Sequence, residues 1–482
     1  MAVRAMGGTV WVWGADRGIG APNPLAWVDG IPSLEDAVVV WGPVPLPQGW
    51  RDHGEPLLLN GGAIGFADME QAVLRYRLRR AGVTMSDGEQ GAGSRSVRQV
   101  QTRSWSSRRR LIVRIFQLEP VSIELLPSTI NGSGLSSGRE LLEDEPLFRR
   151  AGRLAVRALY AAGLHCGIVE AVVLADGTCA VTAVRLPDER ELRSGTIWNV
   201  ALRRFSDEWR KRRKTISTDE AAGSGILIGA DPEFLFVADT GKVVSASRYL
   251  EGGHGSGCDA VVIGGRVRYP IAELRPAPAA SPGRLAANIR QLLLHTSSRV
   301  TDPSLRWLAG GMPVKGFALG GHIHVSGVPF TTRLLHQLDS YVAFPLSLAE
   351  SANDRLRRPR YGALGDFRKQ PHGGFEYRTL PSWLVSPMAT KAALALTLLC
   401  ALETETLDYL PSLEEPFVEA YYAGDRTKLS ACIDPLVQAM SATSSWRDLR
   451  SWVEPYLNAI ARGDQWDERA DIRIKWRIPP YD

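Results

Sequence analysis

The chain has 482 residues, 44% of them hydrophobic and 23% charged, which is typical of a soluble globular protein with more than one domain. Its formal net charge of +5 suits anionic ligands such as nucleotide phosphates but is too small to predict nucleic acid as a partner. The five cysteines form no Cys-x-x-Cys pair, which indicates a reducing compartment and excludes a cysteine zinc site.

The N-terminal residues lack the apolar core and the cleavage site of a signal peptide. The longest apolar run, residues 392–402, is shorter than a membrane span. We therefore expect a cytoplasmic protein with no membrane partner.

A glycine-rich stretch at residues 14–20 follows a predicted strand, as in a dinucleotide-binding loop. Such a loop must open a helix whose N-terminus holds the pyrophosphate. Pro22 and Pro24 follow at once and prevent that helix. We reject a dinucleotide site here.

The first half of the chain alternates predicted helices with predicted strands. Apolar residues at helical spacing, ended by Gly82 and Gly163, predict two helices, and apolar runs predict strands. In chain order these are a helix at 69–82, a strand at 111–116, a helix at 146–162 and a hairpin at 167–184 with an Asp-Gly turn.

That order of elements resembles the ATP-grasp fold of peptide-type ligases, but it departs from that family where the chemistry would lie. The lysine expected at the start of the first helix is absent from Asp68-Met69, and Ala183-Val184-Arg185 stands in place of a magnesium-binding Glu-x-Asn. We therefore interpret residues 1–205 as a degenerate, non-catalytic ATP-grasp-like α/β domain. An unrelated α/β domain is the alternative.

Residues 206–224 are charged and then rich in small residues, which predicts a linker. Trp209 with the basic run after it, like residues 105–110, could contact nucleic acid, but we prefer a solvated helix end or loop. The second domain then covers residues 225–482, and its last part, residues 386–482, is mostly helical.

Four predicted strands of the second domain carry two polar residues separated by one apolar residue or a proline. Because side chains alternate along a strand, both members of each pair face the same way. One such pair is usual on a solvated face, whereas four of them indicate one sheet with a charge-dense face. The pairs are Asp231/Glu233, Glu273/Arg275, His322/His324 and Glu376/Arg378.

The composition of these pairs indicates a metal and phosphate chemistry. Several neighbouring carboxylates repel one another unless a cation lies among them. Carboxylates with an imidazole suit Mg²⁺ or Mn²⁺ better than zinc, and arginines supply charge for phosphate oxygens. Metal ions beside arginines on an open face are what phosphoryl transfer requires.

Residues 225–390 resemble the amidoligase family (COOH-NH2 ligase type 2) of the glutamine-synthetase-like superfamily of carboxylate–amine ligases. The matching segments are GADPEFLF at 229–236, IAELRP at 271–276, MPVK at 312–315, GGHIHVS at 320–326, LGDFR at 364–368 and FEYRTLPS at 375–382. The resemblance implies an α+β fold, with a curved, antiparallel-rich sheet and helices on one side of it.

Position by position, the resemblance also implies roles for single residues. The implied metal ligands are Glu233, Glu273, His322, Glu376 and, with a shorter side chain than the family's glutamate, Asp231; Asp259 is a further candidate acid. The implied catalytic residues are Arg275, His324, Arg368 and Arg378, and the implied nucleotide-binding residues are Lys315, His324, Arg355 and Arg378.

The activity implied is ATP-dependent ligation with Mg²⁺ or Mn²⁺, in which a substrate carboxylate is phosphorylated and an amine attacks the acyl-phosphate. The expected partners are small-molecule or peptide carboxylates and amines, and a homo-oligomer is compatible with this assignment. A metal-dependent hydrolase and an inactive scaffold of the same fold are the alternatives. The many arginines argue against the first, and the retention of all four polar pairs argues against the second.

Overall fold

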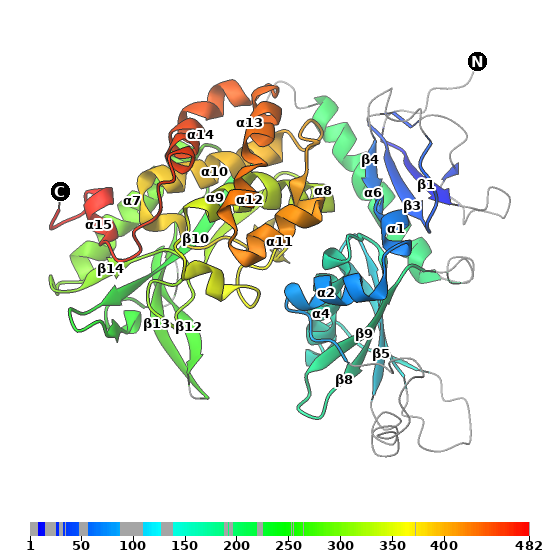
Figure 1. Cartoon of the computed structure of the whole chain (residues 1–482), viewed down its shortest axis with the longest axis horizontal. Coiled ribbons are helices and arrows are strands. Elements are labelled where there is room, and N and C mark those ends of the chain that lie inside the picture. Colours follow the sequence, from blue (N-terminus) through cyan, green and yellow to red (C-terminus); the bar gives the residue numbers. More distant parts are fainter. Residues whose placement is uncertain are drawn as a thin grey trace. The chain divides into compact units, whose positions relative to one another are not determined.

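The computed structural model divides into two compact units, Met1–Ala221 and Ala222–Asp482 (Figure 1). It describes residues 8–14, 26–27, 32–33, 35–47, 56–86, 109–126, 138–187, 191, 196–218 and 225–481, except 252, 254, 264 and 372. The glycine-rich loop after residue 14, the basic residues 105–108 and the end of the predicted linker, 219–224, lie outside the described residues.

The first unit contains two sheets and several helices. A parallel sheet has the order β2-β1-β3-β4, formed by β1 (Val10–Gly14), β2 (Ala26–Trp27), β3 (Ala37–Trp41) and β4 (Leu57–Leu59). An antiparallel sheet has the order β7-β6-β5-β8-β9, formed by β5 (Arg110–Phe116), β6 (Glu119–Leu126), β7 (Arg139–Glu140), β8 (Gly167–Val173) and β9 (Cys179–Arg185). The helices are α1 (Ala63–Ala67), α2 (Gln71–Arg80), α4 (Pro146–Ala161) and α6 (Thr196–Thr218).

The structure confirms most elements predicted for this unit and corrects one. Helices α2 and α4 end before Gly82 and Gly163, both with φ of 76°, and β8 and β9 form the predicted hairpin. The residues up to 218 that were predicted as linker belong instead to α6. This charged stretch is helical because Trp209 is buried in the core, stacks on Phe205 and donates its indole N–H to a backbone carbonyl.

The second unit is built on an eight-stranded antiparallel sheet with the main order β12-β13-β10-β15-β17-β16. Its strands are β10 (Leu227–Val237), β12 (Gly255–Ile263), β13 (Arg266–Arg275), β15 (Gly321–Ser326), β16 (Phe367–Lys369) and β17 (Phe375–Tyr377). The short strands β11 (Val243–Val244) and β14 (Arg306–Leu308) pair with the C-terminal end of β10. The predicted α+β fold with an antiparallel-rich sheet is confirmed.

Helices cover one face of this sheet (Figure 1). Helix α7 (Pro282–Arg299) begins at Ser281, whose hydroxyl accepts the N–H of Arg284, and packs on β10, β12 and β13. It meets the face that Ser256 and Leu274 share, since Thr296 donates to Ser256 at 2.7 Å. Glu273, the neighbour of Leu274, therefore points to the opposite face.

Helix α10 (Pro387–Leu402) contacts β15, α7, α8 and α14. The other helices of this unit are α8 (Thr332–Leu338), a π-helical turn η3 (Asp339–Ala343), α9 (Phe344–Ala349), α11 (Glu415–Ala423), α12 (Arg426–Ser430), α13 (Ile433–Ser441), α14 (Trp446–Ala461) and α15 (Ile472–Trp476). In the described parts of the chain, none of the helices is both long and apolar enough to cross a membrane.

Candidate active site

The strand register brings the predicted polar pairs together on the sheet face away from α7. Asp231 on β10 lies opposite His322 on β15, and Glu233 lies opposite Glu273 on β13. On the next strand pair, His324 lies opposite Glu376 on β17. Directly opposed residues share a face, with their Cβ atoms about 4.5–5.5 Å apart. One continuous row of carboxylates and imidazoles therefore crosses four strands.

Asp231 and the two histidines form the centre of this row. The Nδ1 atom of His322 lies 3.3 Å from Asp231 Oδ1 and 3.3 Å from Glu376 Oε1, and Nε2 of His324 lies 3.3 Å from Asp231 Oδ2. Asp231, His324 and Glu376 each offer a ligand atom within 4.8 Å of the others. Asp231 Oδ1 and His324 Nε2 are buried and make no hydrogen bond to any described residue. Oxygen and nitrogen atoms that lie this close together and lack hydrogen-bond partners are suited to bind a divalent cation.

Glu376 is fully buried and is held from both sides by cationic side chains. Arg378 donates to its Oε1 at 2.7 Å, and Arg368 donates through Nε to its Oε2 at 2.7 Å. Gln370, which the sequence motifs did not single out, donates to the same Oε2 at 3.0 Å. These bonds fix the Glu376 carboxylate, and the half-buried Arg378 still reaches the adjoining pocket.

Glu233 and Glu273 lie on the other side of Asp231, and both are nearly inaccessible. Glu233 accepts the N–H of Gly320 at 2.6 Å, whereas Glu273 is ion-paired with Arg275, which also donates to the carbonyl of Gly253. Burial raises the pKa of Glu233 to about 7, although the charge of His322 lowers it. Burial and the negative charge of Asp231 raise the pKa of Glu273 to about 8.

The electrostatics around Asp231 differ from those around the glutamates. Burial disfavours its charged form, yet the adjacent imidazoles of His322 and His324 hold the pKa of Asp231 below its usual range. Burial likewise opposes protonation of His322, but Asp231 raises the pKa of that imidazole. Burial thus disfavours the charged forms of Glu233 and Glu273, and a bound cation would stabilise those charged forms.

The two glycines before the histidines are required by close packing. A Cβ atom on Gly320 would collide with the His322 ring, and one on Gly321 would collide with the carbonyl of Pro381 and with Trp383. The Trp383 indole in turn donates to the Gly321 carbonyl at 2.8 Å. The Gly-Gly-His-x-His motif therefore seats the histidine strand tightly against the segment that follows β17.

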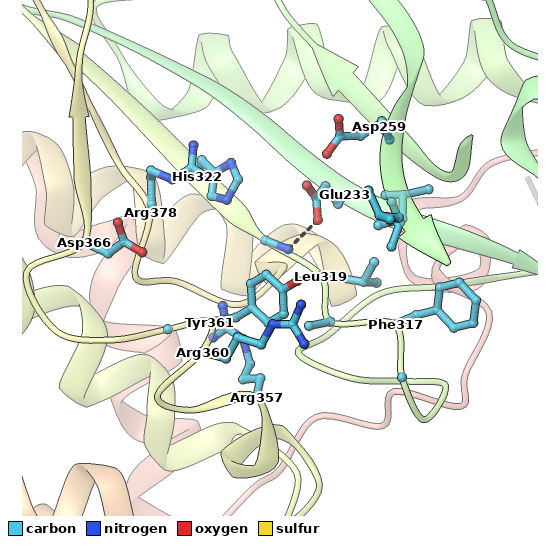
Figure 2. Close-up of a pocket in the computed structure, with 18 residues that line it drawn as sticks. Glu233, Asp259, Phe317, Leu319, His322, Arg357, Arg360, Tyr361, Asp366 and Arg378 are labelled. Carbon is cyan, nitrogen blue, oxygen red and sulfur yellow. Dashed lines mark hydrogen bonds between the residues drawn. The ribbon is translucent and has the colours of Figure 1, made fainter. Parts of the chain in front are cut away.

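A pocket of about 300 Å³ opens beside the row (Figure 2). Figure 2 shows Glu233 and Asp259 on one side of it and Arg357, Arg360 and Tyr361 across from them. Its other lining residues include His322, Arg378 and Asp366, and the apolar residues Val261, Val262, Ile271, Phe317 and Leu319. The pocket therefore combines guanidinium groups with an apolar wall.

The structure does not bring every predicted residue to this pocket. Arg355 is exposed, donates to the carbonyl of Ala423 and is absent from the pocket lining. Lys315 is exposed on the loop between β14 and β15, beside the lining residue Gly316. The lining residues Arg357, Arg360 and Tyr361 were missed, although the arginine-rich run that contains them was visible in the sequence.

Residues 228–478, more than half of the chain, match the family model described as Phage phiEco32-like COOH.NH2 ligase-type 2. The chain belongs to this family. As a COOH.NH2 ligase it is a carbon–nitrogen ligase, which confirms the predicted enzyme class.

No curated protein matches this ligase in sequence. Solved structures that resemble it include a bifunctional glutathione synthetase from Pasteurella multocida (12% identity, TM-score 0.33, 53% of this chain and 51% of that chain) and GmaS without ligand (14%, 0.30, 72% and 93%). The ATP-grasp ligase PsnB complexed with minimal precursor is a third (12%, 0.23, 33% and 74%). At these scores the similarities carry no functional argument.

Proposed function

We propose that this COOH.NH2 ligase uses Mg²⁺-ATP to phosphorylate a substrate carboxylate and then joins the acyl group to an amine. The product would be an amide or isopeptide bond. One observation carries the proposal: four carboxylates, two histidines and three arginines from five strands meet on one sheet face beside a pocket. These are Asp231, Glu233, Glu273, Glu376, His322, His324, Arg275, Arg368 and Arg378.

The carboxylates and histidines of the row would hold the magnesium or manganese ions. When bound, such ions neutralise phosphate oxygens and stabilise the charge of the transferring phosphoryl group. The sequence predicts His322 as a ligand and His324 as a phosphate contact. That division stays a prediction, because both imidazoles lie 3.3 Å from an oxygen of Asp231.

The arginines of the site would hold the anionic groups of the reaction. Arg378 and Arg368 each use part of their guanidinium group on Glu376, which orients the rest toward the open face. Arg360, whose guanidinium lies over the Tyr361 ring, stands at the pocket and would orient the substrate carboxylate. The apolar wall of Val261, Phe317 and Leu319 would keep water from the acyl-phosphate.

Phosphate release tests the proposal. Pools of amino acids, dicarboxylates and short peptides are incubated with ATP and Mg²⁺, with hydroxylamine as a small amine that converts any acyl-phosphate into a hydroxamate. We expect phosphate and hydroxamate in equal amounts for at least one carboxylate, and about a hundredfold less of both products, or lower still, with Glu376→Gln. Glu170→Gln in the first unit is the matched control, because Glu170 is also a strand glutamate paired with arginine. Phosphate release that Glu376→Gln leaves unchanged would refute the proposal.

A further inference from the structure

Two buried carboxyl groups outside the row, Asp354 and Glu468, meet at the start of the loop that lines the pocket. Asp354 opens the 3-10 helix η4 (Asp354–Arg357) and is fully buried, and Glu468 lies between α14 and α15 with 6% of its surface exposed. Neither residue lines the pocket or belongs to a sequence motif of the site. Acids of this kind are rarely buried without a specific partner.

Both side chains bind the same stretch of backbone. Glu468 Oε1 accepts the N–H of Gly311 at 2.5 Å and that of Met312 at 3.3 Å, and Asp354 Oδ1 also accepts the N–H of Met312, at 2.9 Å. Their second oxygens both go to Ser351: Asp354 Oδ2 accepts its N–H at 2.9 Å, and Glu468 Oε2 accepts its hydroxyl at 2.8 Å. The two acids therefore tie together three segments that are distant in sequence.

Two glycines allow the Asp354 and Glu468 side chains to come this close to the backbone. Gly310 has a φ of 122°, and a Cβ atom on it would collide with the Glu468 carboxylate. A Cβ atom on Gly311 would collide with Asp354. The glycine pair thus lets two acidic side chains reach the backbone where a side chain at either position would block them.

The two carboxyl groups are neighbours, because Asp354 Oδ1 and Glu468 Oε1 both accept the N–H of Met312, and a proton between them would remove their repulsion. Burial raises the pKa of Asp354 to about 8, and the adjacent Glu468 carboxyl adds to the shift. The other charged groups that face the pair are Arg357, which opposes the shift, and Glu350, which is itself ion-paired with Arg358. Below about pH 8 the pair shares a proton, whereas above it two buried negative charges repel each other.

The segments that the pair ties together form two walls of the pocket. The loop that begins at Gly311 contributes Gly316 to Gly320 to the lining, supplies the N–H that binds Glu233 and continues into β15. The segment that begins at Ser351 continues to the lining residues Arg357, Arg360 and Tyr361. A change at the pair is thereby transmitted to the pocket through short lengths of backbone.

We propose that Asp354 and Glu468 are a positioning pair that shares one proton, and that this proton holds both pocket walls in place for the ligase reaction. Neither residue touches substrate. The pair acts by fixing the loop at residues 311–320, so that loss of the proton releases the loop and lowers turnover.

Glu468→Gln is the decisive variant. Both oxygens of Asp354 accept backbone N–H groups, so this acid must remain. The side-chain amide introduced by Glu468→Gln can donate an N–H in place of the shared proton, and its oxygen can still accept from Gly311. Glu403→Gln is the matched control, because Glu403 is equally buried and its partners among the described residues, Ser444, Ser445 and Thr406, include no second carboxyl group.

Amide hydrogen exchange of residues 311–320, corrected for the intrinsic pH dependence of exchange, is measured from pH 6.5 to 9. We expect protection in the wild-type protein to fall about tenfold between pH 7 and 9, with the same fall in Glu403→Gln and little change in Glu468→Gln. A wild-type protein whose protection does not fall, or a Glu468→Gln protein that follows it, would overturn the proposal. The wild-type measurement decides alone if the variant does not fold.

Turnover tests the link to catalysis. Glu468→Gln should keep kcat within about threefold at pH 7 and move the alkaline decline of kcat to higher pH, whereas Glu468→Ala should lose at least about tenfold in kcat at every pH. A Glu468→Gln pH profile that superimposes on the wild-type profile would refute the positioning role. Hydrogen exchange needs neither ATP nor a substrate, so its outcome is independent of whether the proposed ligase reaction is observed.

Discussion

Each unit contains an antiparallel sheet with charged residues at alternate strand positions, but the two sheets differ in how far these residues are buried. In the first unit Arg114 pairs with Glu124 at 3.2 Å, and Arg185 pairs with Glu170 and with Glu191. Every one of these partners is partly exposed, at 18% or more of its side-chain surface. This face is a set of balanced, solvated ion pairs.

In the second unit the corresponding face is buried. Glu376 is inaccessible, Glu233 and Glu273 are 6% exposed, and Asp231 keeps an oxygen with no hydrogen bond to any of the described residues. An exposed ion pair adds only about 0–1 kcal/mol to the free energy of unfolding. A buried charge whose partner is missing lowers that free energy by about 3–5 kcal/mol. Alternating charges thus identify a strand face, whereas burial of charged groups with shifted pKa values indicates a site.

The largest effect that the comparison predicts is at Glu376. Glu376→Gln should lower the rate of ATP-dependent phosphate release by about 10²- to 10³-fold, because Arg368 and Arg378 lose the carboxylate that orients them and the cation loses a ligand. Glu170→Gln should leave the rate unchanged. Equal losses in both variants, with both proteins folded by circular dichroism, would show that the two sheets do not differ in the proposed way.

The second prediction concerns pH and magnesium. The raised pKa values of Glu233 and Glu273, about 7 and about 8, mean that without Mg²⁺ the stability they contribute is complete below pH 4 and is lost as the pH rises through 7 to 8. Mg²⁺ binds the deprotonated groups, so its apparent affinity should rise by up to about tenfold per pH unit and per proton released.

Thermal unfolding with and without Mg²⁺ from pH 5.5 to 8.5 measures this linkage. The gain in Tm on adding Mg²⁺ should grow with pH. Because the two Tm values at each pH are subtracted, the effect of groups that titrate away from the metal, such as Asp354, cancels. Glu273→Gln should flatten the curve. A gain in Tm that is independent of pH would show that these glutamates do not bind the cation.

The third prediction separates the pocket from the surface within one arginine-rich loop. Arg360→Ala should raise KM for the carboxylate substrate by about tenfold with a smaller change in kcat, since Arg360 lines the pocket and would bind the ground state and transition state alike. Arg355→Ala, outside the pocket, should leave both constants unchanged. A larger rise in KM for Arg355→Ala than for Arg360→Ala in steady-state kinetics would indicate that the carboxylate substrate binds near Arg355.

The smallest predicted effect is in the first unit. Arg114→Ala removes a partly exposed ion pair with Glu124 and a hydrogen bond to Ser122, so we expect a loss of at most about 1 kcal/mol in the free energy of unfolding. Turnover should be unchanged. A loss of several kcal/mol in a denaturant titration would mean that this face is as sensitive to charge as the face that carries Glu376.

The sequence predicted which residues share the polar face, because strand alternation is a local property of the backbone. It could not predict that Asp231 lies opposite His322 or Glu233 opposite Glu273, since register depends on pairing between distant segments. Arg357 and Arg360 were missed because they lie in and just after a 3-10 turn, where no periodicity marks a face. The first part of the predicted linker, up to residue 218, is helical instead, and Trp209 in this part is buried in the core of the first unit.

The register of pairing between β10 and β15 determines how variants with substitutions in these two strands would behave. A shift of one residue in this register would turn Ile323 and Val325 toward the row and both histidines toward α10, so the site exists in a single register. Substitutions in these two strands should therefore yield mixtures of competent and incompetent molecules rather than uniformly slower ones. Titrating the number of active sites in such a preparation would show a reduced fraction of molecules, each turning over at the normal rate.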